Sequence, residues 1–276
     1  MKPLISIILP TYNGEKYIAA AIESVFGQTY ISWELLIISD GSIDNTRSIV
    51  EKYAKNENRI IFIENEKNIG IQKTLNKGLS LAKGDYIARL DDDDRWIDID
   101  KLSLQVIYFL EHEGYVLVGT NALVVNTEGK EVSKNTMPQT DRDIRSRLLS
   151  KNCFLHPTVM INKAALERAG LYSEKKEFLH AEDYELWLRL GKQGKMGNII
   201  QYTTALTAHS DSLTSSNRSS QARNFLKIAW RYRQYYPNSF IGIAISVLRY
   251  VGFVAISFVP IPQSMVYKIQ RIYRSI

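Results

Sequence analysis

Four short apolar runs separated by amphipathic segments constrain the fold of this chain more than any other feature. The apolar runs cover residues 5–9, 35–38, 60–63 and 86–90. In residues 15–28, between the first two runs, apolar residues recur at the spacing of one helix face from Ile18 to Val25. Buried strands that alternate with helices through short connections predict an α/β, Rossmann-like, doubly wound and mainly parallel sheet.

Polar side chains stand at the carboxyl ends of the predicted strands, where doubly wound sheets bind their ligands. These residues are Thr11, Asn13, Asp40, Asn68, Asp91 and Asp93. No Gly-x-Gly-x-x-Gly follows the first strand, and the chain contains no Gly-Lys-Ser/Thr phosphate loop. A dinucleotide-binding fold and a P-loop NTPase are therefore both disfavoured.

Four consecutive aspartates, Asp91 to Asp94, follow the fourth predicted strand. Their like charges repel one another, a cost that the fold must tolerate or exploit. One interpretation is a hard-cation site for Mg²⁺ or Mn²⁺ beside a phosphorylated substrate. The other is a solvated acidic loop that caps the next helix. The run stands at the carboxyl end of a strand, at the same sheet edge as Thr11, Asp40 and Asn68, and this position favours the metal site. Asp94 is expected to cap the following turn.

The strand–helix alternation changes after residue 98. Helices are predicted at residues 99–112, 140–150, 163–169, 182–193 and 224–236, and strands at residues 115–125, 158–161 and 199–207. Residues 209–220 are rich in Ser, Thr and Asn, which predicts a loop.

The C-terminal part of the chain is basic and apolar. No Asp or Glu follows Asp211, whereas nine Lys and Arg do, so the net charge of +6 is concentrated there. Residues 240–259 are long enough to span a membrane, but a central arginine, Arg249, costs about 2.5–3.5 kcal/mol on insertion. Gly242 and Gly252 favour broken or in-plane helices. An anionic membrane surface is the expected partner rather than nucleic acid; a true span and soluble packing are the alternatives.

The single cysteine, Cys153, excludes an internal disulfide and fits a reducing compartment. The N-terminal apolar run is too short for a signal peptide. The expected location is cytoplasmic, peripheral or monotopic on the inner face of the cell membrane.

Five motifs occur in a fixed order that resembles family 2 glycosyltransferases with the GT-A fold, in particular bacterial polysaccharide and O-antigen glycosyltransferases. The resemblance covers roughly residues 4–215. The motifs are Ile5-Ser6-Ile7-Ile8-Leu9-Pro10-Thr11-Tyr12-Asn13, Ser39-Asp40-Gly41-Ser42-x-Asp44, Asn68-x-Gly70 with Asn76-x-Gly78, Gly84-Asp85-Tyr86-Ile87-Ala88-x-Leu90-Asp91-Asp92-Asp93-Asp94, and Glu182-Asp183-Tyr184-x-Leu186-Trp187.

The resemblance implies a nucleotide site at the first four motifs. Its residues are Pro10, Thr11, Tyr12, Asn13, Asp40, Asn68, Asp91 and Asp92. Within this set, Tyr12 is placed to stack on the base and Asp40 to hydrogen-bond a uracil ring. Arg89 is a further candidate to flank the nucleotide.

The resemblance also implies a metal site and a catalytic base. Asp93 and His209 are the implied ligands of a Mn²⁺ or Mg²⁺ ion that bridges the donor diphosphate. Asp183 is the implied general base for the acceptor hydroxyl, and Glu182 is the alternative candidate for this base. His156 is either an acceptor-side residue or a structural histidine.

The implied activity is that of an inverting, metal-dependent glycosyltransferase of the hexosyltransferase type. It would move one sugar from a nucleotide-diphosphate sugar, with UDP the expected nucleotide, to a saccharide or lipid-linked saccharide in polysaccharide or lipopolysaccharide assembly. The Gln-x-x-Arg-Trp motif of processive synthases is absent, which favours transfer of a single sugar. Ser39 departs from the family, which often has Asp there, and Asp92 stands where a small residue is usual.

The resemblance divides the chain into three parts. Residues 1–98 form the nucleotide-sugar-binding half of the GT-A domain, residues 99–216 its acceptor-binding half, and residues 217–276 a C-terminal helical, membrane-associating appendage. A nucleotidyltransferase of similar sheet architecture and a non-catalytic, membrane-bound GT-A-like scaffold are the alternatives.

Overall fold

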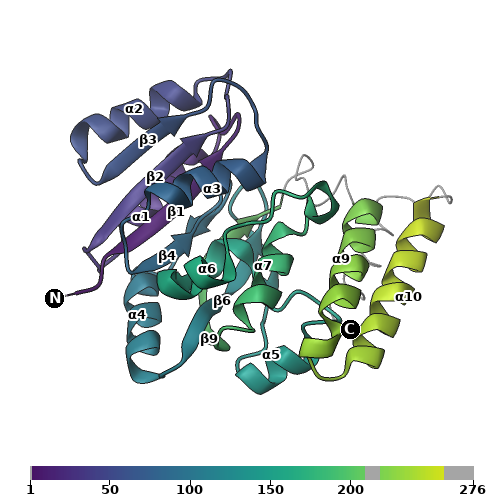
Figure 1. The fold of residues 1–276 in the computed structure, drawn as a ribbon. Helices are drawn as coiled ribbons and strands as arrows, with labels where there is room; N and C mark the ends of the chain where they lie inside the picture. Colours follow the sequence, from purple (N-terminus) through teal and green to yellow (C-terminus); the bar gives the residue numbers. More distant parts are fainter. Residues whose placement is uncertain (1, 209–217, 258–276) are drawn as a thin grey trace.

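The computed structural model describes residues 2–208 and 218–257, in which helices cover both faces of a nine-stranded sheet (Figure 1). The strands are β1 (Ile5–Thr11), β2 (Trp33–Ser39), β3 (Ile60–Glu64), β4 (Tyr86–Arg89), β5 (Arg95–Trp96), β6 (Tyr115–Val125), β7 (Glu131–Asn135), β8 (Met160–Asn162) and β9 (Lys195–Thr207). Their order is β3-β2-β1-β4-β8-β6-β9-β5, and β7 pairs with β6 beside this path.

The first half of the sheet is parallel, as the sequence predicts. β3, β2, β1 and β4 pair in parallel, and three helices connect them: α1 (Ile18–Phe26), α2 (Thr46–Asn56) and α3 (Ile71–Leu81). Every residue of β1 and β2 is buried, which explains why these strands are continuous apolar runs in the sequence. Their carboxyl ends lie together, because Thr11 is in register with Ser39.

The second half of the sheet is mixed, so the expectation of a mainly parallel sheet is correct only for the first half. β8 lies antiparallel between β4 and β6, whereas β9 runs parallel to β6. β6 and β7 form a hairpin around the turn at Glu128 and Gly129, and strands joined by such a short turn must be antiparallel. β5 pairs antiparallel with β9.

Alternate residues of the central strands pack into two apolar clusters, one on each face of the sheet. Ile7 and Leu9 face the cluster that contains α1, α2 and α4 (Lys101–Glu111). Ile8 faces the other cluster, which contains α3, α6 (Lys163–Ala169) and α7 (Glu182–Leu190). This two-residue alternation is the normal geometry of a strand buried on both faces.

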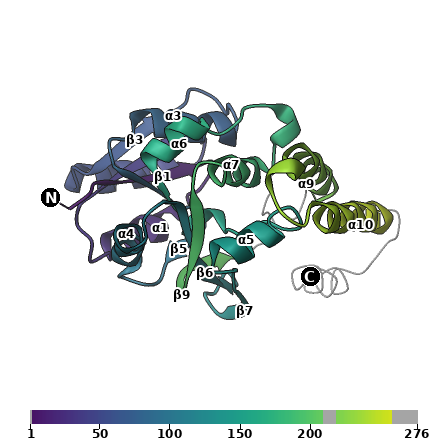
Figure 2. The ribbon, with the colours of Figure 1, turned by 60° about the horizontal axis from the view of Figure 1, so that its bottom comes forward.

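The remaining helices lie at the end of the molecule farthest from β3. α5 (Asp141–Arg147) begins at Thr140, whose side chain caps the helix. α9 (Arg218–Tyr232) and α10 (Ser239–Ser257) lie side by side, joined by a 3₁₀ turn at Arg233–Tyr235, with α10 outermost (Figures 1 and 2). Ile228 and Ala229 of α9 are fully buried in the same apolar cluster as α7.

α10 is one unbroken helix through Gly242 and Gly252, so a break at these glycines is not found, whereas an in-plane helix stays a prediction. Gly242 permits close packing, because a Cβ there would overlap Leu149. Ser246 Oγ donates to the Leu149 carbonyl oxygen at 3.0 Å. Between residues 2 and 208 and between 218 and 257, the structure contains no helix with the length and apolar character of a membrane span.

Candidate active site

The loops that follow β1 and β2 are bound to each other. The Asp40 N–H donates to the Thr11 carbonyl oxygen at 2.8 Å. Asn13, in the left-handed conformation with φ 54°, donates its N–H to Ser42 Oγ at 3.1 Å and accepts from the Ile43 N–H at 2.9 Å. The structure thus brings together the two motifs that the resemblance assigns to the nucleotide.

Pro10 and Tyr12 differ in exposure. Pro10 is buried at the end of β1, so it shapes the backbone beneath the site. The Tyr12 side chain is 51% exposed at the same edge of the sheet. An exposed aromatic ring at this position is available for stacking on a flat base.

Asp40 organises the loop between β3 and α3. Its Oδ1 accepts from Asn65 Nδ2 at 3.0 Å and from the Ile69 N–H at 2.9 Å, and its Oδ2 accepts from the Gly70 N–H at 3.0 Å. Asn68, in the same loop, accepts from the Gly70 N–H at 3.1 Å. Because a carboxylate oxygen can accept two hydrogen bonds, Asp40 Oδ2 retains capacity for one more donor.

The four aspartates after β4 have different surroundings. Asp91 forms an ion pair with Arg89; burial alone would raise the pKa of Asp91, but the Arg89 guanidinium lowers it below its usual value. Asp92 accepts from Thr11 Oγ1 at 2.5 Å. Burial, with the charges of Asp93 and Asp91, raises the pKa of Asp92 to about 7. Asp93 is half-buried.

Asp94 is not the cap of the following turn that the sequence suggests. Its Oδ1 accepts from the Thr207 N–H at 2.9 Å, which ties the acidic stretch to the end of β9. Burial raises the pKa of Asp94 well above its usual value. A helix cap would leave this carboxylate near solvent, whereas the sheet places β9 beside it.

Arg89, which is expected to flank the nucleotide, is buried within the protein. Its side chain is 1% exposed, and it donates to the carbonyl oxygens of Ile8 and Leu90 at 2.8 Å each and to His156 Nε2 at 3.1 Å. His156 Nε2 also lies 2.7 Å from the Tyr172 hydroxyl. Burial and the Arg89 charge lower the pKa of His156 to about 3, so the imidazole is neutral at physiological pH.

Glu182 and Asp183 begin α7. Asp183 Oδ2 accepts from Asn152 Nδ2 at 2.8 Å, and burial raises the pKa of the Asp183 carboxyl. Burial and the Asp183 charge raise the pKa of Glu182 to about 7. Within the part of the chain that the structure describes, buried Glu182 Oε2 has no hydrogen-bond partner.

The acidic stretch after β4 and the start of α7 are close enough for their charges to interact. The Asp91 charge contributes to the raised pKa of Asp183. The pKa of Tyr172 responds to both: burial raises it, the Arg89 charge lowers it, and the charges of Asp183, Glu182 and Asp91 raise it. The structure therefore brings the predicted base and the predicted nucleotide-side acids to one region.

The predicted metal ligands are only partly described. His209 lies outside the described residues, although Thr207, two positions earlier, is bonded to Asp94. Within residues 2–208 and 218–257, no group of three or more His, Cys, Asp or Glu side chains is arranged to hold a metal ion. Among the described residues, Asp93 and its neighbours thus offer carboxylates but not a complete protein cage.

Two site residues, Asn152 and Tyr172, have no signal in the sequence, and the buried contacts of Arg89 are not predicted by it either. Asn152 orients Asp183, Tyr172 contacts His156, and Arg89 pairs with Asp91. Asn152 and Tyr172 belong to irregular segments without periodicity, and Arg89 continues an apolar strand in which a buried cation is unexpected.

Comparison with known proteins identifies the family. The sequence model described as "Glycosyl transferase family 2" matches residues 6–170. A relative from Escherichia coli, named UDP-Glc:alpha-D-GlcNAc-diphosphoundecaprenol beta-1,3-glucosyltransferase WfgD, is 35% identical over 227 residues, which cover 82% of this chain and 84% of the relative.

Solved structures share the fold. TarS residues 1–349 from S. aureus, in complex with UDP-GlcNAc, superposes with a TM-score of 0.72 at 22% identity, covering 91% of this chain and 73% of that one. The mannosyltransferase PcManGT from Pyrobaculum calidifontis, in complex with GDP-Man and Mn²⁺, gives a TM-score of 0.66 at 15% identity, covering 100% and 83%. Because the family model covers more than half of the sequence, this chain belongs to glycosyl transferase family 2 and is a glycosyltransferase.

Proposed function

We propose that this glycosyltransferase moves one sugar from a UDP-linked donor to a hydroxyl group of a lipid-linked saccharide, with inversion at the anomeric carbon. The observation that carries the proposal is a series of contacts that joins the acidic stretch after β4 to α7. Asp91 pairs with Arg89, which donates to His156 Nε2 at 3.1 Å. The His156 ring in turn packs against Trp187 of α7, with ring centroids 5.8 Å apart. One side of this region suits a nucleotide diphosphate and the other suits an acceptor hydroxyl. The name of the Escherichia coli relative specifies a UDP-Glc donor and a GlcNAc-diphosphoundecaprenol acceptor, which supports the proposed donor class and the proposed acceptor class.

The donor nucleotide would bind at the ends of β1 and β2. Exposed Tyr12 offers a stacking surface, and Asp40 Oδ2 can accept one more hydrogen bond, for which the ring N–H of uracil is suited. Asn68 closes the neighbouring loop. The shared fold of the UDP-GlcNAc complex of TarS supports this placement.

The acidic stretch fits a hard divalent cation, Mn²⁺ or Mg²⁺. Such ions are commonly held by one or two carboxylates together with substrate phosphates. After burial, the charges of Asp93 and Asp91 raise the pKa of Asp94, so the stretch contains repulsion that a cation would offset. Asp93 would hold the ion, with His209 as a second ligand. Bound there, the ion would neutralise charge on the departing diphosphate.

Asp183 would act as the general base. Burial raises its pKa, which makes its carboxylate a stronger proton acceptor. In the transfer step Asp183 takes the proton of the acceptor hydroxyl, whose oxygen bonds to the anomeric carbon. The bond from that carbon to the diphosphate oxygen breaks, and UDP leaves with the electron pair. Asn152 keeps the carboxylate oriented during this step.

The lipid part of the acceptor places the enzyme at a membrane surface, on the cytoplasmic side, where α10 would make contact. Gly242 and Ser246 face the protein, whereas Phe240, Leu248 and Val251 are exposed on other sides of the helix. An exposed apolar helix in a chain segment without acidic residues suits an anionic bilayer surface.

The test is a transfer assay with purified protein and a short-chain GlcNAc-diphospholipid acceptor. UDP-, dTDP- and GDP-sugars are supplied separately, with Mn²⁺ or with a chelator, and the configuration of the new bond is determined by NMR. We expect transfer from a UDP-sugar, loss of transfer with the chelator, and inverted configuration. Retained configuration would exclude the single-displacement mechanism.

The two alternatives give different results in the same assay. A nucleotidyltransferase would release pyrophosphate from a nucleoside triphosphate and would not require Asp183. A non-catalytic scaffold would turn over none of the donors, with or without Mn²⁺. Family membership favours the glycosyltransferase over both.

A further inference from the structure

The turn before the Glu182–Asp183 pair has an unfavourable backbone conformation. His180 has a φ of 65°, in the left-handed region that residues with a β-carbon seldom adopt. It follows a 3₁₀ turn at Lys176–Phe178 and precedes the first residue of α7 by two positions. Such a conformation persists only where surrounding contacts hold it.

Helix α9 supplies two hydrogen bonds to this turn. Gln221 Nε2 donates to the His180 carbonyl oxygen at 2.9 Å, and Asn224 Nδ2 donates to the Leu179 carbonyl oxygen at 2.9 Å. Gln221 and Asn224 are three residues apart, so they lie on the same helix face. Asn224 is buried. Two consecutive carbonyl groups are therefore held by amides from one helix that is distant in the sequence.

Contacts on the other side of the Glu182–Asp183 pair also come from α9. The rings of Tyr184 and Phe225 are stacked, with centroids 3.7 Å apart and planes 8° apart. The Tyr232 hydroxyl donates to Glu185 Oε1 at 2.5 Å. α9 thus contacts the chain both immediately before and immediately after the pair.

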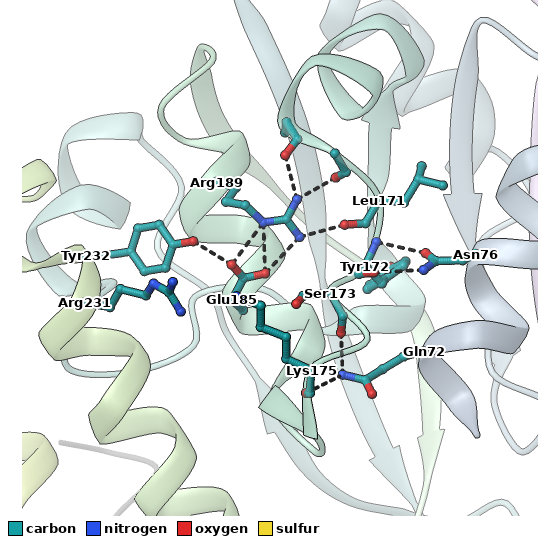
Figure 3. Close-up of polar contacts among 12 residues, drawn as sticks. Gln72, Asn76, Leu171, Tyr172, Ser173, Lys175, Glu185, Arg189, Arg231 and Tyr232 are labelled. Carbon is teal, nitrogen blue, oxygen red and sulfur yellow. Dashed lines mark hydrogen bonds and ion pairs between the residues drawn. The ribbon is translucent and has the colours of Figure 1, made fainter. Parts of the chain in front are cut away.

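Glu185 links this contact to the nucleotide half of the enzyme, as Figure 3 shows. It pairs with Arg189 at 2.8 Å, and Arg189 Nη2 donates to the Leu171 carbonyl oxygen at 2.8 Å. From the opposite side, Asn76 of α3 donates to the Tyr172 carbonyl oxygen at 2.8 Å and accepts from the Tyr172 N–H at 2.9 Å. The segment that leads to α7 is therefore held by α3, α7 and α9 together.

We propose that Gln221 and Asn224 are positioning residues for the sugar transfer, because they hold the turn at Leu179 and His180 so that Glu182 and Asp183 face the acidic stretch. The catalytic part of this inference rests on the proposed function. Without the two amides, His180 can relax to a right-handed conformation, which would redirect the start of α7. α9 would then be part of the catalytic apparatus rather than part of a separable appendage.

The test replaces the amides by apolar side chains of similar shape, as Gln221→Met, Asn224→Leu and the double variant. The control is Ile228→Val, which removes one buried methyl group from the same helix without touching the turn. Two quantities are measured: amide hydrogen exchange over residues 176–184, and kcat and donor KM in the transfer assay. If the double variant fails to fold, Gln221→Met at the half-buried position is used alone.

We expect faster exchange over residues 176–184 and a fall in kcat of about 10- to 100-fold, with donor KM unchanged. The Ile228→Val control should lower the melting temperature without either effect. Amide hydrogen exchange over residues 176–184 equal to that of the control would overturn the proposal that α9 holds the turn. Faster exchange with unchanged kcat would overturn the positioning role. A wild-type enzyme that transfers no sugar would reject the proposed function and the catalytic role, while the exchange data would still decide whether α9 holds the turn.

Discussion

Thr11 Oγ1 donates a 2.5 Å hydrogen bond to Asp92 Oδ2, which joins the end of β1 to the acidic stretch after β4. Gly14 lies directly over this pair, and a Cβ there would overlap both oxygen atoms. Asp92 therefore has a structural partner at the end of β1. The bond also ties the acidic stretch to the loop that carries Tyr12, which is the proposed nucleotide side of the site.

Gly14→Ala should disturb the Thr11–Asp92 bond. The added methyl group must displace Asp92 or Thr11, and overpacking of this kind costs about 1–3 kcal/mol. We expect weaker UDP binding by calorimetry and a lower melting temperature. Gly27→Ala is the matched control, because a Cβ there meets its nearest atom at an ordinary 3.7 Å. Equal UDP affinity in the two variants would show that the Thr11–Asp92 bond does not shape the nucleotide site.

Asp183→Asn should lower kcat by about 10²–10⁴-fold, because an amide cannot accept the proton of the acceptor hydroxyl. Donor KM should change little, because the proposed role of Asp183 is with the acceptor hydroxyl. Asn152 can still bond the new side chain, so the fold should persist. Steady-state kinetics with Glu182→Gln in parallel decides between the two acids: a larger loss in Glu182→Gln than in Asp183→Asn would assign the base to Glu182.

Glu182 should make folding stability depend on pH. Its pKa rises from 4.5 to about 7 on folding, so the folded protein binds this proton more tightly than the unfolded chain. The resulting stabilisation is full below about pH 4.5 and is lost as the pH rises through 7. Glu182→Gln removes this dependence, so at pH 8 the variant should be more stable than the wild type by about 3 kcal/mol.

Urea unfolding at pH 4.5 and pH 8 measures this difference. The exposed Glu66→Gln is the control and should follow the wild type at both pH values. Asp92 and Asp94 titrate alike in all three proteins, so their contribution cancels in the comparison. A Glu182→Gln variant less stable than the wild type at pH 8 would mean that Glu182 has a favourable partner when ionised.

The sequence predicts helices and strands well where a segment is long enough for its apolar periodicity to be recognised. The bounds of β6 and α6 agree with the predicted residues 115–125 and 163–169. The mixed pairing of the second half could not be predicted, because β5 and β8 have only two and three residues and show no period. Their pairing depends on neighbours that come from distant parts of the chain.

The candidate site could be predicted at the level of residue types but not of partners. Strand ends and motif order indicate Asp40, Asp93 and Asp183, but no local pattern predicts that Asp94 bonds to Thr207. The partners of Arg89 could not be predicted either, because a cation after an apolar run is normally exposed. Here Arg89 is buried, and its hydrogen bonds to the carbonyl oxygens of Ile8 and Leu90 and its ion pair with Asp91 offset the cost of burial.

The exposed face of α10 should bind anionic membranes. Phe240 is 91% exposed and Leu248 is 68% exposed, and burial of one such side chain is worth about 1.5–3 kcal/mol. Phe240→Ser with Leu248→Ser should therefore lower binding to vesicles that contain phosphatidylglycerol by at least about tenfold. The helix should remain folded, because its packing face at Gly242 and Ser246 is unchanged.

Leu110→Ser is the matched control for this experiment. Leu110 is 67% exposed and belongs to α4, which lies on the other side of the molecule from α10 (Figure 1). Vesicle sedimentation with anionic and neutral lipids measures the bound fraction, and transfer to a detergent-solubilised acceptor checks that the enzyme is intact. Anionic vesicles should retain the control and release the double variant, with neutral vesicles binding both weakly. Equal binding of the two proteins to anionic vesicles would mean that α10 is not the membrane contact, and the exposed apolar residues would then have to pack against protein.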